Sequence, residues 1–183
     1  GLWVLKLALY SLCAAVLWKI LGYYTQEAAN KTAGVWAFAA AVSPGNDIRP
    51  ENFSVLFFLF LLHRLEARRL GRPAFKYSAL WTAGLFALWA NLHGGFVFGL
   101  GLLGLYAAAE FFRRKSSALF AVLAVGASAV LLNPFGFQVY SVAAAHARQA
   151  GGLGAYLKEW QGASVLSYWL WPFWGLLIAS FFA

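Results

Sequence analysis

Two polar side chains interrupt an apolar stretch at Trp89-Ala-Asn-Leu-His-Gly-Gly-Phe96. An amide and an imidazole are costly at membrane depth unless they face protein or a water-filled cavity. His93 can act as a general base or donate a hydrogen bond to a phosphate. The two glycines that follow it allow a tight turn and the close approach of two helices or a ligand. A packed helix hairpin in which Asn91 caps backbone groups explains the motif equally well.

A second set of reactive side chains lies in the loop formed by residues 43–52. Asp47, Arg49 and Glu51 alternate in this loop. Two carboxylates beside an arginine can bind a phosphate or a divalent metal, or they can act as acid and base. The alternative is a solvated loop in which Arg49 pairs locally.

Two later segments combine aromatic rings with polar groups. Residues 132–140 contain Asn133, Gln138 and three aromatic rings, which suits an aromatic-belt turn or a groove for an acceptor or a lipid tail. Further along, Trp160 could stack on a sugar face while Glu159 bonds its hydroxyls. An interfacial amphipathic helix explains this last segment almost as well.

Other motifs carry little functional weight. Residues 99–104 fit the string G-x-G-x-x-G, but they lie in an apolar run without a preceding strand, which excludes a dinucleotide fingerprint. The three histidines lack the spacing of metal ligands, and Cys13, the single cysteine, cannot form an intrachain disulfide. The sequence shows no Ser-His-Asp pattern, zinc signature or P-loop.

The composition indicates what must position these residues. The chain is 62% hydrophobic and 11% charged, whereas a soluble domain has about 25% charged residues. A full membrane span needs about 20 apolar residues. The apolar runs are residues 1–21, 33–43, 53–63, 77–92, 95–112, 118–133 and 164–183.

These runs predict an all-α fold, a polytopic helical transmembrane bundle of six or seven membrane segments. Because both ends of the chain lie inside apolar runs, we expect residues 1–183 to be a single transmembrane domain truncated at both ends. Segments 33–43 and 53–63 are short enough to be tilted or re-entrant. The run over residues 77–112 is too long for one span, so we expect it to divide at the two glycines after His93.

The net charge of +8 is mostly a signal of topology. Residues 64–76 hold five basic side chains and residues 113–115 hold three, and two predicted spans separate these loops. The positive-inside rule places both loops in the cytoplasm. Alternation then gathers three polar regions on the outer face, namely residues 44–52, 91–95 and 134–163. The charge therefore gives no support to nucleic acid as a partner.

The order of these motifs resembles a known group of proteins. Arg49-Pro-Glu-Asn-Phe-Ser54, the motif at residues 89–96, Asn133-Pro-Phe-Gly136 and Glu159-Trp-Gln161 are similar to segments of bacterial polytopic proteins related to the GT-C glycosyltransferases. Those proteins resemble the dolichyl-phosphate-mannose protein mannosyltransferases. The resemblance covers most of residues 45–161. It implies a transferase that uses a polyprenyl-phosphate sugar on the non-cytoplasmic face of the bacterial inner membrane, facing the periplasm.

The resemblance also implies roles for the polar residues. We expect Arg49 and His93 to hold the donor phosphate, and we expect a lipid bilayer and a lipid-linked sugar donor as partners. A divalent metal is left open as a cofactor, with Asp47 or Glu51 as its ligand. The expected catalytic residues are Asp47, Glu51 and His93. The expected substrate-binding residues are Arg49, Asn91, Asn133, Gln138, Glu159 and Trp160.

Two other functions remain open from the sequence. A transporter or flippase for a lipid-linked or polar solute would use the same outer region as half of an alternating-access path, but no internal repeat supports it. A non-catalytic membrane subunit would use these motifs only to cap helices.

Overall fold

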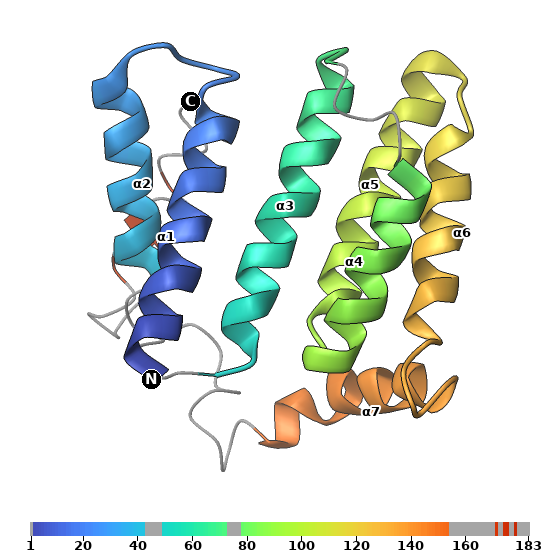
Figure 1. Cartoon of the computed structure of the whole chain (residues 1–183). Helices are drawn as coiled ribbons and strands as arrows, with labels where there is room; N and C mark the ends of the chain where they lie inside the picture. The colour runs from blue at the N-terminus through green and yellow to red at the C-terminus, as the bar shows by residue number, and fades with distance from the viewer. Residues whose placement is uncertain are drawn as a thin grey trace. The chain divides into compact units, whose positions relative to one another are not determined.

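A computed structural model describes residues 2–42, 49–72, 78–153 and the single positions 171, 174, 175 and 178. Every regular element longer than one turn in these ranges is an α-helix, which confirms the all-α class. The helices are α1 (Leu2–Leu21), α2 (Ala28–Val42), α3 (Glu51–Arg69), α4 (Ser78–Leu92), α5 (Phe96–Arg114), α6 (Ala118–Val130) and α7 (Gln138–Leu153), as labelled in Figure 1.

One predicted helix boundary agrees with the structure and another does not. The division of residues 77–112 is confirmed, because α4 ends at Leu92 and α5 begins at Phe96. The expected end of segment 53–63 is wrong, because α3 continues to Arg69 and carries basic residues that were expected in a loop. The residues that follow the apolar run are mostly Arg, Leu, Glu and Ala, and all four types favour helix. The apolar run therefore stops at the first charged residues, but the helix continues through them.

Two of the described helices, α1 and α5, are long and apolar enough to cross a membrane. Two shorter apolar helices cover residues 79–92 and 118–130. The structure therefore provides two candidate spans by length and composition, and the prediction of six or seven spans stays a prediction.

The chain divides into two compact units. The first unit contains residues 1–16 and 48–144, and the second contains residues 17–47 and 145–183. Within the second unit, α2 packs on the end of α1, where Lys31 Nζ lies 4.9 Å from the ring centroid of Trp18. The prediction of a single domain over residues 1–183 stays a prediction.

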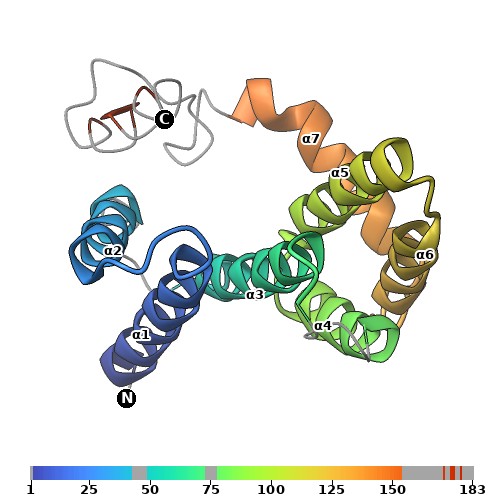
Figure 2. The same ribbon diagram turned by 90° about the horizontal axis from the view of Figure 1, so that it is seen from above.

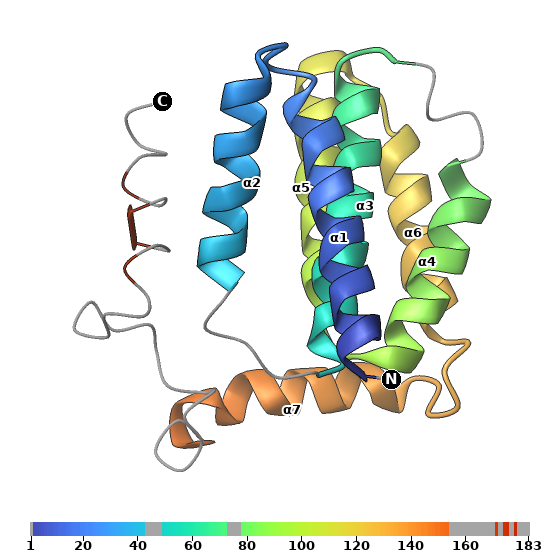
Figure 3. The ribbon, with the colours of Figure 1, turned by 60° about the vertical axis from the view of Figure 1, so that its left-hand side comes forward.

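Helices α3, α4, α5 and α6 form the body of the first unit. The links His93–Gly95 and Lys115–Ser117 are short, so the helices that they join run antiparallel. Seen end-on in Figure 2, α3 lies beside α4 and α5, and α6 lies beside the same two helices on the other side. The first turns of α7 pack across one end of these helices, as Figure 3 shows.

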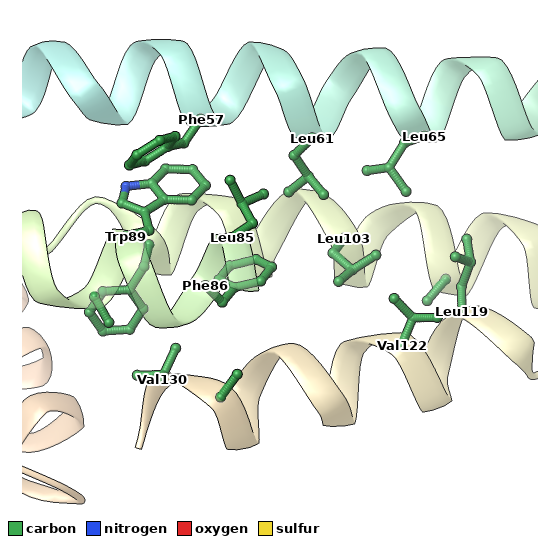
Figure 4. Close-up of a cluster of buried hydrophobic side chains, with 14 residues drawn as sticks. Phe57, Leu61, Leu65, Leu85, Phe86, Trp89, Leu103, Leu119, Val122 and Val130 are labelled. Atoms are coloured by element: carbon green, nitrogen blue, oxygen red, sulfur yellow. The ribbon is translucent and has the colours of Figure 1, made fainter. Parts of the chain in front are cut away.

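Buried hydrophobic side chains fill the inside of this bundle, and the rings of Phe57, Phe86 and Trp89 lie together among them (Figure 4). Trp89 is only 1% exposed, and its ring stacks on Phe86 with the centroids 5.8 Å apart. Phe57 from α3 meets the same indole edge-on at 5.7 Å. Gly99 lets α5 approach, because a Cβ there would lie 2.5 Å from Cζ3 of Trp89. Burial of large rings dominates the packing energy of such a core.

Candidate functional site

Each end of the first unit carries a group of polar side chains. The histidine cluster lies where α3 begins and where α4 and α6 end, and it consists of Ser54, Trp89, Asn91, His93 and Asn133. The arginine cluster lies at the other end, where α3 and α5 end, and it consists of Glu66, Arg68, Arg69, Tyr106, Glu110 and Arg114.

The geometry of the histidine cluster fixes the tautomer of His93. The Nε1–H of Trp89 donates to Oγ of Ser54 at 2.8 Å, so the Ser54 hydroxyl proton is available to donate to Nδ1 of His93 at 2.7 Å. The backbone N–H of Gly95 also donates to Nδ1, at 3.1 Å. Because Nδ1 accepts from these groups, the neutral ring carries its proton on Nε2. His93 therefore offers an N–H donor on its other edge.

Gly95 is required for this arrangement. A Cβ at this position would overlap Oγ of Ser54 and would lie 2.9 Å from Nδ1 of His93. The glycine thus permits close contact between the start of α3 and the α4–α5 turn. This contact is the reason that the second glycine of the motif must lack a side chain.

The two asparagines of the cluster join α4 to the end of α6. Asn133 is buried, and its Nδ2 donates to the backbone carbonyl of Ala90 at 2.8 Å. Its Oδ1 accepts from the N–H of Phe135 at 2.9 Å, which closes a turn after α6. Asn91 is exposed, and its Nδ2 donates to the carbonyl of Ala87 at 2.7 Å. The turn at residues 91–95 and the end of α6 therefore lie together, and the gathering of residues 44–52, 91–95 and 134–163 on an outer face stays a prediction.

Tyr140 anchors the start of α7 to the same end of the bundle. Its hydroxyl donates to the carbonyl of Ala127 at 2.7 Å, and its ring meets Phe96 edge-on at 5.9 Å. Burial raises the pKa of the Tyr140 phenol. The phenol therefore stays neutral and keeps donating to the carbonyl of Ala127 well above neutral pH.

The structure brings Asn91, His93 and Asn133 together, as the sequence predicted. Arg49 and Glu51 lie at the beginning of α3, within five residues of Ser54, and Gln138 is exposed at the first residue of α7. The remaining predicted site residues, Asp47, Glu159 and Trp160, lie outside the described residues.

Two further observations bear on the chemistry of this end. The sequence did not predict Ser54 as a member of the site, because its partners lie 35 and 39 residues away and leave no local pattern.

Within the described ranges, no group of three His, Cys, Asp or Glu side chains could hold a metal ion. A metal ligand at Asp47 stays a prediction, because that residue is outside these ranges.

The arginine cluster ties α3 to α5 by charge. Arg68 forms two parallel hydrogen bonds with the Glu110 carboxylate, both 2.6 Å long. Arg69 pairs with Glu66 at 2.8 Å, and the Tyr106 hydroxyl also donates to Glu66. The Arg114 guanidinium donates to the backbone carbonyl of Arg69 at 3.3 Å, so the two basic segments meet at this end of the bundle.

No family model, curated protein or solved structure matches this chain.

Proposed function

We propose that this chain is the part of a GT-C-like membrane glycosyltransferase that binds a polyprenyl-phosphate sugar donor at the histidine cluster. The observation that carries the proposal is the orientation of His93. Its Nδ1 is held by Ser54 and Gly95, which leaves the Nε2–H of the part-exposed ring available to a ligand. An N–H donor on this helix turn suits a phosphate oxygen, and Arg49 at the start of α3 would supply the positive charge.

The membrane location of this enzyme is supported by the apolar surface of the first unit. Several large side chains stand exposed on α4 and α5, among them Leu80 (81%), Phe98 (75%) and Phe112 (73%). Large exposed apolar surface marks a membrane or protein contact. With the arginine cluster in the cytoplasm, the histidine cluster faces the periplasm.

The hydrogen bonds of His93 favour a binding role over a role as general base. A base must accept a proton, and the acceptor atom of this ring is already occupied by Ser54 and Gly95. In the proposed reaction, an acceptor hydroxyl attacks the anomeric carbon and the bond from that carbon to the phosphate oxygen breaks. The hydroxyl proton then passes to a carboxylate, for which Asp47 and Glu51 are the candidates in this chain, and polyprenyl phosphate leaves.

Two substitutions distinguish the role of His93 Nε2, which would bind the ligand, from that of Nδ1, which contacts Ser54 and Gly95. In His93→Asn, the amide oxygen takes the place of Nδ1 and the outward donor is lost. In His93→Gln, the amide group reaches the position of Nε2 and the Nδ1 acceptor is lost. We expect His93→Asn to weaken binding of a polyprenyl-phosphate sugar about tenfold or more, since one hydrogen bond to a charged group is lost.

Binding would be measured on the full chain in nanodiscs with a radiolabelled polyprenyl-phosphate sugar. We expect His93→Gln to retain more binding than His93→Asn but to unfold at a lower temperature. His63→Asn on α3 is the matched control and should bind the donor as the parent chain does. Equal donor binding by the parent chain and His93→Asn would refute the proposed role of His93.

One observation favours a second function, that of a non-catalytic membrane subunit. Asn91, Asn133 and Trp89 each donate to a partner within the bundle, as they would if the motifs only joined helices. Such a subunit would not bind polyprenyl phosphate, so an absence of binding to the parent chain would favour this function.

A further inference from the structure

A cavity of about 310 Å³ opens at the arginine cluster, on the opposite end of the first unit from His93. It is bordered by the ends of α3 and α5 and by the first turn of α6. Its walls combine four arginine side chains with the apolar side chains of Leu65, Leu105, Ala109 and Leu119.

The cavity carries a net positive charge. Two of its four guanidinium groups, those of Arg68 and Arg69, are held in salt bridges with Glu110 and Glu66. Arg113 and Arg114 add two further positive charges on the last turn of α5, and both are exposed. The Arg114 guanidinium also donates to the backbone carbonyl of Arg69 at 3.3 Å, which holds it at the cavity. The cavity therefore suits an anion.

The remaining walls are apolar and open to the surface of α5. Leu105 is 71% exposed and Ala109 is exposed one turn further along the same helix face. Leu65 and Leu119 close the inner side and are buried. A ligand that fits this cavity has an anionic group at the guanidinium groups and an apolar chain along α5. A small soluble anion would leave the apolar strip uncovered.

We infer that this cavity binds the phosphate head group of an anionic phospholipid, with an acyl chain lying along Leu105 and Ala109. The planar fork of an arginine matches phosphate oxygens. Basic pockets between helices on the cytoplasmic side of a membrane bind lipid head groups of this kind. The inference rests on the membrane location of the proposed function but does not depend on donor binding at the histidine cluster.

The test uses the full chain in nanodiscs that contain phosphatidylcholine and a titrated fraction of phosphatidylglycerol. The amount of each lipid that stays with the protein after transfer to detergent would be measured by native mass spectrometry. We expect the parent chain to retain phosphatidylglycerol in preference to phosphatidylcholine. The double variant Arg113→Gln, Arg114→Gln should lower that preference about tenfold or more, because it removes two charge-assisted contacts.

The matched control is the double variant Arg72→Gln, Lys115→Gln. It removes the same charge from the same end of the bundle, but neither residue lines the cavity. If the control variant lowers the preference for phosphatidylglycerol as much as the cavity variant does, the lipid is attracted by the basic surface in general. That result would overturn the assignment of a binding site to the cavity. Inorganic phosphate that displaces the lipid at equal concentration would show that the acyl chain contributes nothing, and would overturn the assignment to a lipid. Loss of donor binding in His93→Asn with lipid retention unchanged would separate the two sites.

Discussion

At the scale of single residues, the histidine cluster is organised around the hydrogen-bonding needs of a buried indole. Trp89 is almost completely buried, and its N–H needs an acceptor. The Ser54 hydroxyl oxygen accepts this hydrogen bond, and the same hydroxyl donates a hydrogen bond to Nδ1 of His93. One hydroxyl thus connects the core of the bundle to the part-exposed ring of His93.

Replacing Ser54 by alanine should therefore destabilise the fold. The Trp89 N–H would lose its acceptor, and an unsatisfied buried donor costs about 1–3 kcal/mol. The free energy of unfolding would be measured by denaturant titration of the purified chain in detergent. Ser141→Ala is the control, because the Ser141 hydroxyl makes one exposed hydrogen bond to the carbonyl of Gln138, and we expect a change within about 0.5 kcal/mol. Equal losses in both variants would contradict the network.

The sequence could predict part of this cluster. Asn91 and His93 stand out because they are polar within an apolar run. Ser54 does not stand out, since a serine near the start of a helix is common and its partner lies on another helix. At the opposite end of the bundle, the sequence likewise does not predict which charged residues pair. Glu110 lies in an apolar run, and only the fold reveals that it pairs with Arg68.

At the scale of elements, glycines decide how closely the helices approach. Gly99 and Gly126 face Phe86 from α5 and α6, and a Cβ at Gly126 would lie 2.9 Å from the Phe86 ring. Gly101 lies on the exposed face of α5 with nothing within 4 Å of its Cβ position. The apolar run shows that α5 is helical, but it does not show which glycine contacts a neighbour.

This difference gives a matched pair of substitutions on one helix. Gly99→Ala should destabilise the first unit by about 1–3 kcal/mol, because the methyl group overlaps the buried Trp89 ring. Gly101→Ala should stabilise it by about 0.5–1 kcal/mol, because alanine favours helix over glycine. Thermal unfolding would be followed by circular dichroism. We expect the unfolding temperature of Gly99→Ala to lie below that of the parent chain and the unfolding temperature of Gly101→Ala to lie above it. The reverse order would mean that α5 is rotated relative to its neighbours.

At the scale of the whole molecule, hydropathy predicted most of the helices. The distribution of basic residues predicted which helix ends lie together at one end of the bundle. Hydropathy could not predict the length of α3, because charged residues continue a helix as well as apolar ones. It also could not distinguish a full span from a short buried helix, since both are apolar. The two basic segments meet where Arg114 donates to the backbone carbonyl of Arg69, and their location in the cytoplasm stays a prediction.

The proposed membrane orientation can be tested with single cysteines. Cys13 is the single cysteine of the chain and is buried, so Cys13→Ser gives a background without thiols. Gly94→Cys and Ser117→Cys introduce thiols at exposed positions at opposite ends of α5. We expect an impermeant maleimide to label Gly94→Cys only from outside the cell and Ser117→Cys only from the cytoplasmic side. Both should react after detergent permeabilisation. Labelling of both from one side would contradict the orientation.

The two polar clusters also respond differently to ionic strength. Charges interact over about 8 Å at 0.15 M salt but only about 3 Å at 1 M, so added salt weakens the attraction between Arg68 and Glu110. The Ser54 hydroxyl bonds to the Trp89 indole and to Nδ1 of His93 without an ion pair between two charged side chains. Added salt therefore acts on the attraction at the arginine cluster and not on the contact between Ser54 and Trp89. Helices α3 and α5 stay together at the arginine cluster in either case, because Leu65 and Leu103 belong to the same buried core.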